Sequence, residues 1–191
     1  MDATVGRRER KKAATRQALA DAALNLFLEH GYDRVTIRDV AEAADVSTTT
    51  LLKHFPSKEA LVFDQDTDRE AGLVAAVRDR APDRSVPRAL CEYVKRAHLH
   101  APGAAPRFGA FADLVRTTPA LDEYAHRMWT RHQVALARAV ARATGAEDDD
   151  PRCAALARFA LEASSLARGS DDPARALDAA FDLLEHGWSA G

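Results

Sequence analysis

Apolar residues recur at intervals of three and four along almost the whole of this 191-residue chain. Alanine is abundant and β-branched residues are sparse, and both biases favour helix over strand. A spacing of three and four places side chains on one face of an α-helix, whereas a spacing of two would indicate a strand. The chain is therefore predicted to be all-α.

Proline, glycine and polar clusters divide the chain into nine predicted helices, the first of which ends at a glycine cap, Gly31. The helices cover approximately residues 12–30, 36–44, 47–55, 58–80, 86–101, 104–117, 119–144, 151–168 and 173–188. An N-terminal domain of three helices over residues 8–57 and a larger helical domain over residues 58–191 are expected.

The second predicted helix begins with two local signals that agree. Thr36 can cap the helix while Asp39 reaches back from three residues later, and Val35 can pack on Val40 as a hydrophobic staple. The third helix repeats this pattern, with Ser47 as its cap. Two short helices joined by a tight turn are typical of a helix-turn-helix unit.

The polar side chains of this unit are predicted to lie on its outer face. Small Ala41 allows the two helices to approach, and Val46 and Leu51 wedge them onto the first helix. Hydroxyl and cationic groups at the start of a helix suit major-groove base edges and phosphates. The outward residues would be Thr48, Thr49, Lys53 and His54, with Thr36 and Arg38 placed to hold phosphate. An ordinary helical hairpin with a polar face is the alternative.

Charge is distributed unevenly, although the formal net charge is only −2. Six basic residues and one acid lie between Arg7 and Arg16, whereas 21 acids outnumber 17 basic residues from Glu59 onward. A basic end on an acidic body is expected when that end meets a polyanion. A solvated tail would also be basic, so the segment Arg7 to Lys12 either lies along DNA or is disordered in the free protein.

At these residues the chain resembles the TetR family of transcriptional regulators. The run VSTTTLLKHFPSKEAL, residues 46–61, is similar to the family's recognition helix, the following turn and the start of the fourth helix. The resemblance covers about residues 12–63 and implies a homodimer that binds a palindromic double-stranded DNA operator. By family position it implies these DNA-facing residues: Thr36, Arg38, Thr48, Thr49, Thr50, Leu52, Lys53, His54 and Lys58.

Two residues depart from the family pattern, in which glycine is usual at the position of Asp45 and tyrosine at that of Leu52. Aspartate can adopt the left-handed conformation at modest cost, so the turn is expected to persist. Leu52 cannot donate a tyrosine hydroxyl to phosphate, and an apolar contact with a thymine methyl is the alternative.

The larger domain is predicted to bind a small-molecule effector. One stripe of helix 119–144 combines Tyr124, Met128 and His132, with Trp129 at its edge; such a stripe can be core or the wall of an apolar pocket. The stretch LVRTTPALDEYAHRMW, residues 114–129, resembles mycofactocin-type regulators of the family, whose ligands include acyl-CoA thioesters. The expected ligand-binding residues are Tyr93, Phe108, Phe111, Tyr124, Met128, Trp129 and His132.

The last two helices carry more apolar surface than one face needs, which suggests a four-helix dimer interface; a monomer core is the alternative. The two cysteines, Cys91 and Cys153, fit neither a disulfide framework nor a zinc site. The sequence contains no signal peptide, apolar span of about 18 residues, phosphate loop or nucleophile motif. We therefore expect a cytoplasmic protein without enzyme activity, cofactor, metal site or membrane attachment.

The sequence thus predicts a ligand-responsive regulator, most simply a repressor that an apolar or acyl-CoA-like effector releases from its operator. A lipid- or acyl-CoA-binding helical carrier with a vestigial helix-turn-helix is the alternative. Leu52 is the only residue that favours the carrier.

Overall fold

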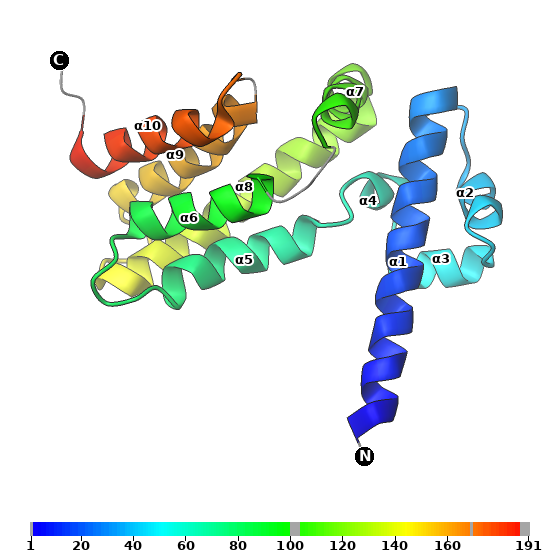
Figure 1. Cartoon of the computed structure of the whole chain (residues 1–191), viewed down its shortest axis with the longest axis horizontal. Helices are drawn as coiled ribbons and strands as arrows, with labels where there is room; N and C mark the ends of the chain where they lie inside the picture. The colour runs from blue at the N-terminus through cyan, green and yellow to red at the C-terminus, as the bar shows by residue number, and fades with distance from the viewer. Residues whose placement is uncertain (1, 100–103, 169, 188–191) are drawn as a thin grey trace. The chain divides into compact units, whose positions relative to one another are not determined.

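A computed structural model describes residues 2–99, 104–168 and 170–187 of the chain. Within these residues the backbone forms ten helices and no strand (Figure 1). They are α1 (Asp2–His30), α2 (Ile37–Ala43), α3 (Thr48–His54), α4 (Lys58–Val62), α5 (Asp66–Arg78), α6 (Val86–Leu99), α7 (Ala104–Thr117), α8 (Pro119–Thr144), α9 (Pro151–Arg168) and α10 (Pro173–His186). The predicted all-α class is confirmed.

The prediction of one helix over residues 58–80 was wrong, which makes ten helices rather than nine. The backbone leaves the helix at Phe63, which has φ −110° and ψ 47°. The Phe63 ring stacks on Tyr124 at 5.2 Å between centroids and meets Phe111 edge-on at 6.0 Å. The next residue, Asp64, accepts a hydrogen bond from Arg16 through its carbonyl oxygen. These contacts from distant residues interrupt the helix.

The first helix begins at Asp2, about ten residues before the predicted start. The segment Arg7 to Lys12 is therefore helical rather than an extended or disordered arm. At the other end the helix stops as expected at Gly31, whose φ of +84° suits a residue without a side chain and whose N–H donates to the Phe27 carbonyl.

The chain divides into two compact units. The first comprises Met1–Asp66 and Ala104–His126, so α4, α7 and the first residues of α8 pack with the helix-turn-helix segment. Leu19, Ala23 and Phe27 of α1 form the centre of its core. The other buried residues of this core are Ala20, Tyr32, Val35, Val40, Ala41, Leu51, Phe55, Ala60, Leu61, Val62 and Leu121. The functional division at residue 57 stays a prediction.

The second unit comprises Thr67–Gly103 and Arg127–Gly191. In it α6, α9 and α10 pack on one another, and α5 and the rest of α8 complete the core. Leu90, Leu136 and Leu177 are fully buried there. Arg80 follows α5 and donates to the carbonyl oxygens of Val77 and Ala143, near the ends of α5 and α8. Its guanidinium thereby satisfies carbonyls that helix ends leave without a partner.

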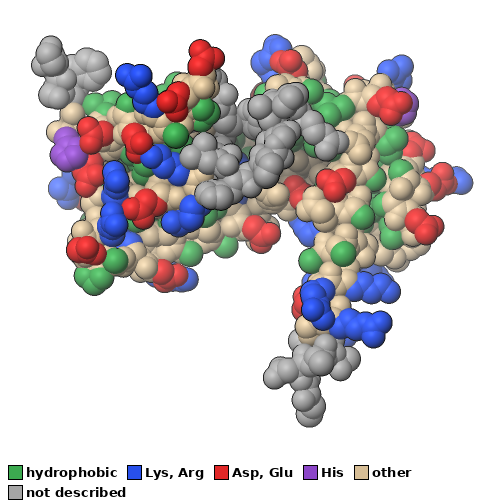
Figure 2. Space-filling view, viewed as in Figure 1, with side chains coloured by type: hydrophobic (Ala, Val, Ile, Leu, Met, Phe, Trp, Pro, Cys, Tyr) green, Lys and Arg blue, Asp and Glu red, His purple; other side chains and the backbone are tan. Residues whose placement is uncertain are grey.

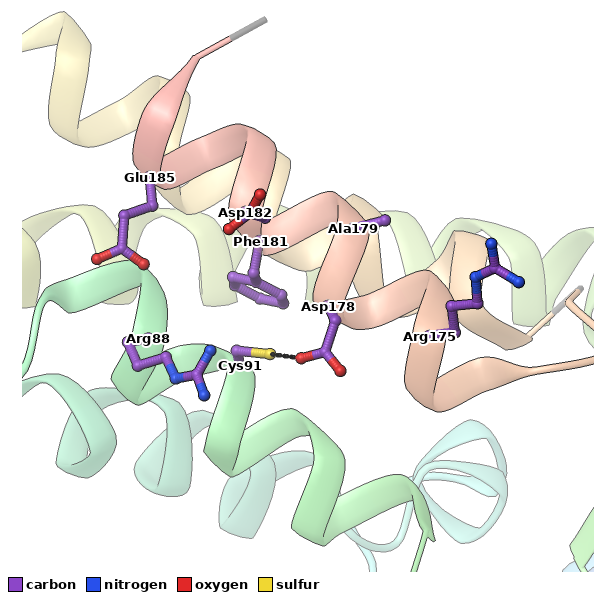
Figure 3. Close-up of a pocket in the computed structure, with 8 residues that line it drawn as sticks. All are labelled: Arg88, Cys91, Arg175, Asp178, Ala179, Phe181, Asp182 and Glu185. Atoms are coloured by element: carbon purple, nitrogen blue, oxygen red, sulfur yellow. Dashed lines mark hydrogen bonds between the residues drawn. The ribbon is translucent and has the colours of Figure 1, made fainter. Parts of the chain in front are cut away.

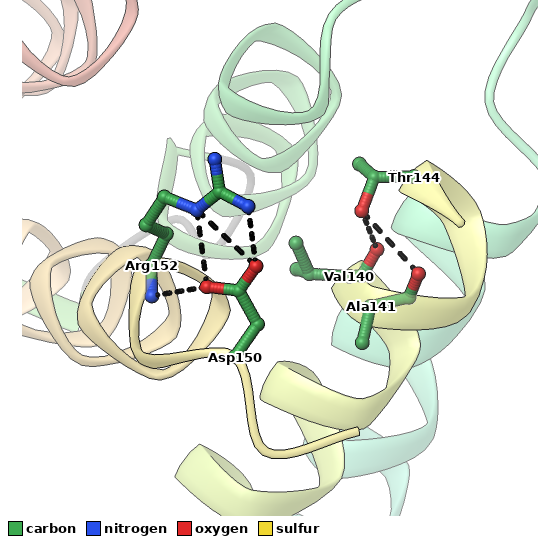
Figure 4. Close-up of polar contacts among 5 residues, drawn as sticks. All are labelled: Val140, Ala141, Thr144, Asp150 and Arg152. Atoms are coloured by element: carbon green, nitrogen blue, oxygen red, sulfur yellow. Dashed lines mark hydrogen bonds and ion pairs between the residues drawn. The ribbon is translucent and has the colours of Figure 1, made fainter. Parts of the chain in front are cut away.

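The connection from α8 to α9 contains the acidic run that ends at Asp150. Asp150 accepts hydrogen bonds from the backbone and guanidinium of Arg152, while Thr144 bonds back to the Val140 and Ala141 carbonyls (Figure 4). Hydrogen bonds from Arg152 lower the pKa of the Asp150 carboxyl. Asp150 therefore belongs to a local turn. No group of side chains suited to holding a metal ion occurs among the described residues.

Candidate nucleic-acid interface

The start of α2 is fixed by a reciprocal cap. The Thr36 hydroxyl accepts from the Asp39 N–H at 3.2 Å, and the Asp39 carboxylate accepts from the Thr36 N–H at 2.7 Å. The predicted capping box is thus confirmed. These hydrogen bonds lower the pKa of Asp39, so the carboxylate stays charged near the positive end of the helix. Val35 and Val40 are both buried beneath the cap, as the staple requires.

The turn between α2 and α3 depends on Asp45, whose φ is +52°. It is the only residue other than glycine with positive φ in the described part of the chain. The next residue, Val46, donates its N–H to the Ala41 carbonyl at 2.9 Å and so closes the turn. The expectation that aspartate would take the left-handed conformation here is confirmed.

The third helix has one buried and one exposed face. Ser47 caps it by accepting from the Thr50 N–H at 3.1 Å. Leu51 and the following Phe55 are completely buried against the rest of the first unit. The exposed side chains are Thr48, Thr49, Leu52 and Lys53, and Leu52 is 49% exposed. Two hydroxyls, an apolar group and a cation therefore share the solvent-facing surface of α3.

The remaining predicted DNA-facing residues make contacts within the protein. The Thr50 hydroxyl lies 2.9 Å from the Ser47 hydroxyl. Arg38 is exposed and donates to Glu42 at 2.9 Å, one turn along α2. Exposed pairs of this kind contribute little to stability, so Arg38 can exchange its partner for a phosphate at low cost.

Lys58 has a structural position at the start of α4. Its ammonium donates to the Tyr32 carbonyl oxygen and lies 3.9 Å from the centre of the Tyr32 ring. Burial lowers the pKa of Lys58. The Tyr32 hydroxyl in turn donates to Glu59 at 2.9 Å. Lys58 therefore ties the start of α4 to the turn after α1.

Arg16 was not among the residues predicted for this site, yet it supports the end of α3. Its guanidinium donates to the His54 and Asp64 carbonyls, each at 2.7 Å, and lies 4.2 Å from the centre of the Phe55 ring. Burial, then the charges of Arg16 and Lys12, lower the pKa of His54. His54 is therefore neutral at pH 7 and offers a nitrogen donor or acceptor rather than a charge.

The predicted ligand-binding residues fall in both compact units. In the first unit the rings of Phe111 and Tyr124 both pack against the ring of Phe63. In the second unit Trp129 lies edge-on to His132, at 6.0 Å between ring centroids. Met128 and His132 are buried. The side chain of Phe108 lies outside the described residues.

Tyr93 is the predicted ligand residue that lines a described cavity. This cavity, of about 470 Å³, lies between α5 and α6 over small Gly72, Ala75 and Ala76. A second cavity, of about 270 Å³, lies between α6 and α10 and contains Cys91 and Asp178 (Figure 3). Burial raises the pKa of the Cys91 thiol, which keeps it protonated and makes it a poor nucleophile.

The sequence and fold match known regulators. Residues 19–64 match the family described as bacterial regulatory proteins, tetR family. The transcriptional regulator TcmR of Streptomyces glaucescens is 31% identical over 153 residues, which are 76% of this chain and 67% of that protein. The mycofactocin biosynthesis regulator MftR of Mycobacterium tuberculosis is 26% identical over 187 residues, 93% of each chain.

A solved structure extends the likeness to the fold of the whole chain. Thermus thermophilus FadR, a TetR family repressor in complex with lauroyl-CoA, superposes with a TM-score of 0.52 and 22% identity. The match covers 92% of this chain and 96% of that one. Together with the capped pair of helices α2 and α3, these similarities show that the chain belongs to the TetR family of bacterial transcriptional regulators.

Proposed function

We propose that this protein is a repressor that binds a palindromic DNA operator as a homodimer and leaves it when a small apolar or acyl-CoA-like effector binds. The observation that carries the DNA-binding part is the solvent-facing surface of α3, which exposes Thr48, Thr49, Leu52 and Lys53. On the opposite side Leu51 and Phe55 are buried in the core and hold the helix in place. A rigid helix with hydroxyls at its first turn and a cation one turn later suits the major groove.

In this proposal the nine predicted residues have different roles. Thr48, Thr49, Leu52 and Lys53 contact the groove directly, and His54 adds a neutral nitrogen. Arg38 contacts phosphate after release from Glu42. Thr36, Thr50 and Lys58 mainly hold the helix ends in place, because their polar groups already bond within the protein.

Exposed apolar side chains on α9 and α10 support a dimer. Phe159 and Leu166 of α9 are 56% and 71% exposed, and Leu183 of α10 is 43% exposed. Phe159 and Leu166 are seven residues apart, so they lie on the same face of α9. Large apolar groups that share one exposed face indicate a contact surface. A second copy of the chain would cover it and present two recognition helices to successive major grooves, roughly 34 Å apart.

The effector class is proposed from three features. The predicted ligand residues of the second unit combine the apolar surfaces of Met128 and Trp129 with a buried imidazole, His132. Such a mixture suits an apolar ligand with a polar anchor. FadR, which shares the fold, was crystallised with lauroyl-CoA, and MftR is similar over most of its length. Effector binding would favour a dimer whose recognition helices no longer match the groove spacing.

Selection of duplexes from a random-sequence library by the full-length protein tests the DNA-binding part. Recovery of a palindrome, and loss of at least tenfold in affinity for it in the variant Thr49→Ala/Lys53→Ala, would support the proposal. Arg138→Ala/Arg142→Ala removes two exposed cations from α8 and serves as a control. Equal affinity of wild type and Thr49→Ala/Lys53→Ala for every duplex would refute it.

A second measurement separates the repressor from the carrier. Lauroyl-CoA is added to the complex of protein and selected duplex, with free coenzyme A as the control. Release by lauroyl-CoA alone supports the proposed effector class. Binding of lauroyl-CoA by a protein that retains no duplex would instead favour the carrier with a vestigial helix-turn-helix.

A further inference from the structure

The first turns of α1 form an exposed cationic surface. Figure 2 shows the lysine and arginine side chains gathered on the part of α1 that projects past α3. The exposed cations are Arg7, Arg8, Arg10, Lys11 and Lys12, and Glu9 is the one acid among them. No ion pair joins any of these cations to an acid in the part of the chain that the structure describes. Their charge is therefore available to a partner.

This arrangement of charge disfavours the helix that carries it. Arg7 and Lys11 are one turn apart, as are Arg8 and Lys12, and like charges at this spacing repel each other. A negatively charged partner would relieve this repulsion, and a polyanion would do so for several side chains at once.

Part of the cationic surface lies in a row of side chains that begins beside the end of α3. Arg8, Lys12 and Arg16 are spaced by four residues, so they follow one row along α1. Arg16, at the end of this row, donates to the carbonyl oxygen of His54, the last residue of α3. Lys12 lies close enough to His54 for its charge to act on the imidazole. The row therefore starts where the recognition helix ends and leads away from it.

We propose that Arg8 and Lys12 form a second DNA-contact surface, which binds phosphates of the operator duplex beside the groove that α3 enters. This inference rests on the proposed function and adds contacts from outside the helix-turn-helix. Four residues of helix rise by about 6 Å, whereas one strand carries a phosphate about every 3.4 Å along the axis. The two cations can therefore reach different phosphates of one strand. Such contacts add affinity without reading sequence.

The test is a salt titration of the double variant Arg8→Gln/Lys12→Gln. Its matched control is Arg138→Gln/Arg142→Gln, which removes the same charge from two exposed positions at the same spacing on α8. Affinity for the library-selected duplex, extended on both sides, is measured by fluorescence anisotropy over a range of salt. The slope of log affinity against log salt should become shallower by about 0.9 for each lost phosphate contact.

The control should keep the wild-type slope, and both variants should select the same operator sequence. Glutamine is a good helix former, so circular dichroism should show α1 retained and exclude unfolding as the cause.

Equal slopes for Arg8→Gln/Lys12→Gln and its control would overturn the inference. In that case the proposed function still stands if Thr49→Ala/Lys53→Ala abolishes preference for the operator. Absence of duplex binding by the wild-type protein would overturn both. A variant with an unchanged DNA slope that no longer binds anionic lipid vesicles would assign the cations to a membrane surface instead, and would also overturn the inference.

Discussion

The guanidinium of Arg16 donates to the backbone carbonyl of His54, with 2.7 Å from Nη1 to the oxygen, across 38 positions of sequence. The last carbonyls of a helix have no partner within the helix. Arg16 supplies a hydrogen-bond donor for such a carbonyl of α3. It also donates to the carbonyl oxygen of Asp64, just past α4. One side chain of α1 thus binds both the last residue of α3 and a residue just past α4.

Replacement of Arg16 by methionine should destabilise the first unit. The change keeps apolar contact with Phe55 but leaves two partly buried carbonyls without their charged donor. Hydrogen bonds to charged groups contribute about 1.5–3 kcal/mol each, so a loss of about 2–3 kcal/mol is expected after partial rescue by water. Urea unfolding followed by circular dichroism measures it.

Two further variants define the role of Arg16. Arg16→Lys should recover less than half of the loss, because a single ammonium lacks the planar fork that reaches two carbonyls. Arg10→Met, on an exposed part of α1, should change stability by less than about 0.5 kcal/mol. A similar effect of Arg10→Met and Arg16→Met would contradict this account.

Substitutions of Asp45 should follow the cost of its left-handed backbone, φ +52°. Glycine adopts this conformation freely, so Asp45→Gly should equal or exceed the wild type in stability, whereas Asp45→Ala should lose about 1 kcal/mol. Thermal unfolding measures the order of stability of the wild type and the two Asp45 variants. Glu42→Gly in α2 is the control, since glycine inside a helix should cost about 1 kcal/mol. Greater stability of Asp45→Ala than Asp45→Gly would show that the turn does not carry this strain.

Gly72→Ala should destabilise the second unit, although alanine is the better helix former. A Cβ at Gly72 would overlap the hydroxyl oxygen and ring of Tyr93. Overpacking costs about 1–3 kcal/mol, against a gain in helix propensity of about 1 kcal/mol. We expect a net loss of about 1 kcal/mol in urea unfolding.

The variant Tyr93→Ala gives the matching test. In its background Gly72→Ala no longer meets the ring and should stabilise the protein by up to about 1 kcal/mol. The change of sign between the two backgrounds is the expected signature. If Gly72→Ala has the same effect with and without the Tyr93 ring, the close packing does not limit this position.

Leu52 should make the proposed operator sensitive to a thymine methyl group. Its side chain is 49% exposed on the solvent-facing surface of α3, and the thymine C5-methyl is the apolar group that base edges offer in the major groove. Replacing one symmetric pair of thymines by deoxyuridine removes two methyl groups and should weaken binding about fifteenfold, which corresponds to about 1.6 kcal/mol, or about 0.8 kcal/mol for each buried methyl-sized group.

The variant Leu52→Ala identifies the contact. At the sensitive position it should bind the thymine and deoxyuridine duplexes equally, while other positions keep their wild-type response. Anisotropy titrations of the four combinations form a thermodynamic cycle. Deoxyuridine effects that are unchanged in Leu52→Ala would assign the methyl group to another residue.

Local patterns in the sequence were sufficient for the caps of α2 and α3 and for the turn that joins them. The capping box of Thr36 and Asp39, the Ser47 cap and the left-handed Asp45 were all predicted, and the structure confirms them. Each depends on residues within a few positions of one another, so the hydrogen bonds and backbone angles follow from the local chain alone. The family was evident for the same reason, because its recognition segment is short and continuous.

Only the tertiary structure decided the contacts between distant segments. It ended the predicted helix 58–80 at Phe63, where rings from α7 and α8 pack on a residue that local propensity would keep helical. It also brought Arg16 to the end of α3, and it made α4 and α7 part of the first unit. Long side chains and aromatic rings satisfy partners wherever the fold places them, and spacing along a chain does not record which partners those are.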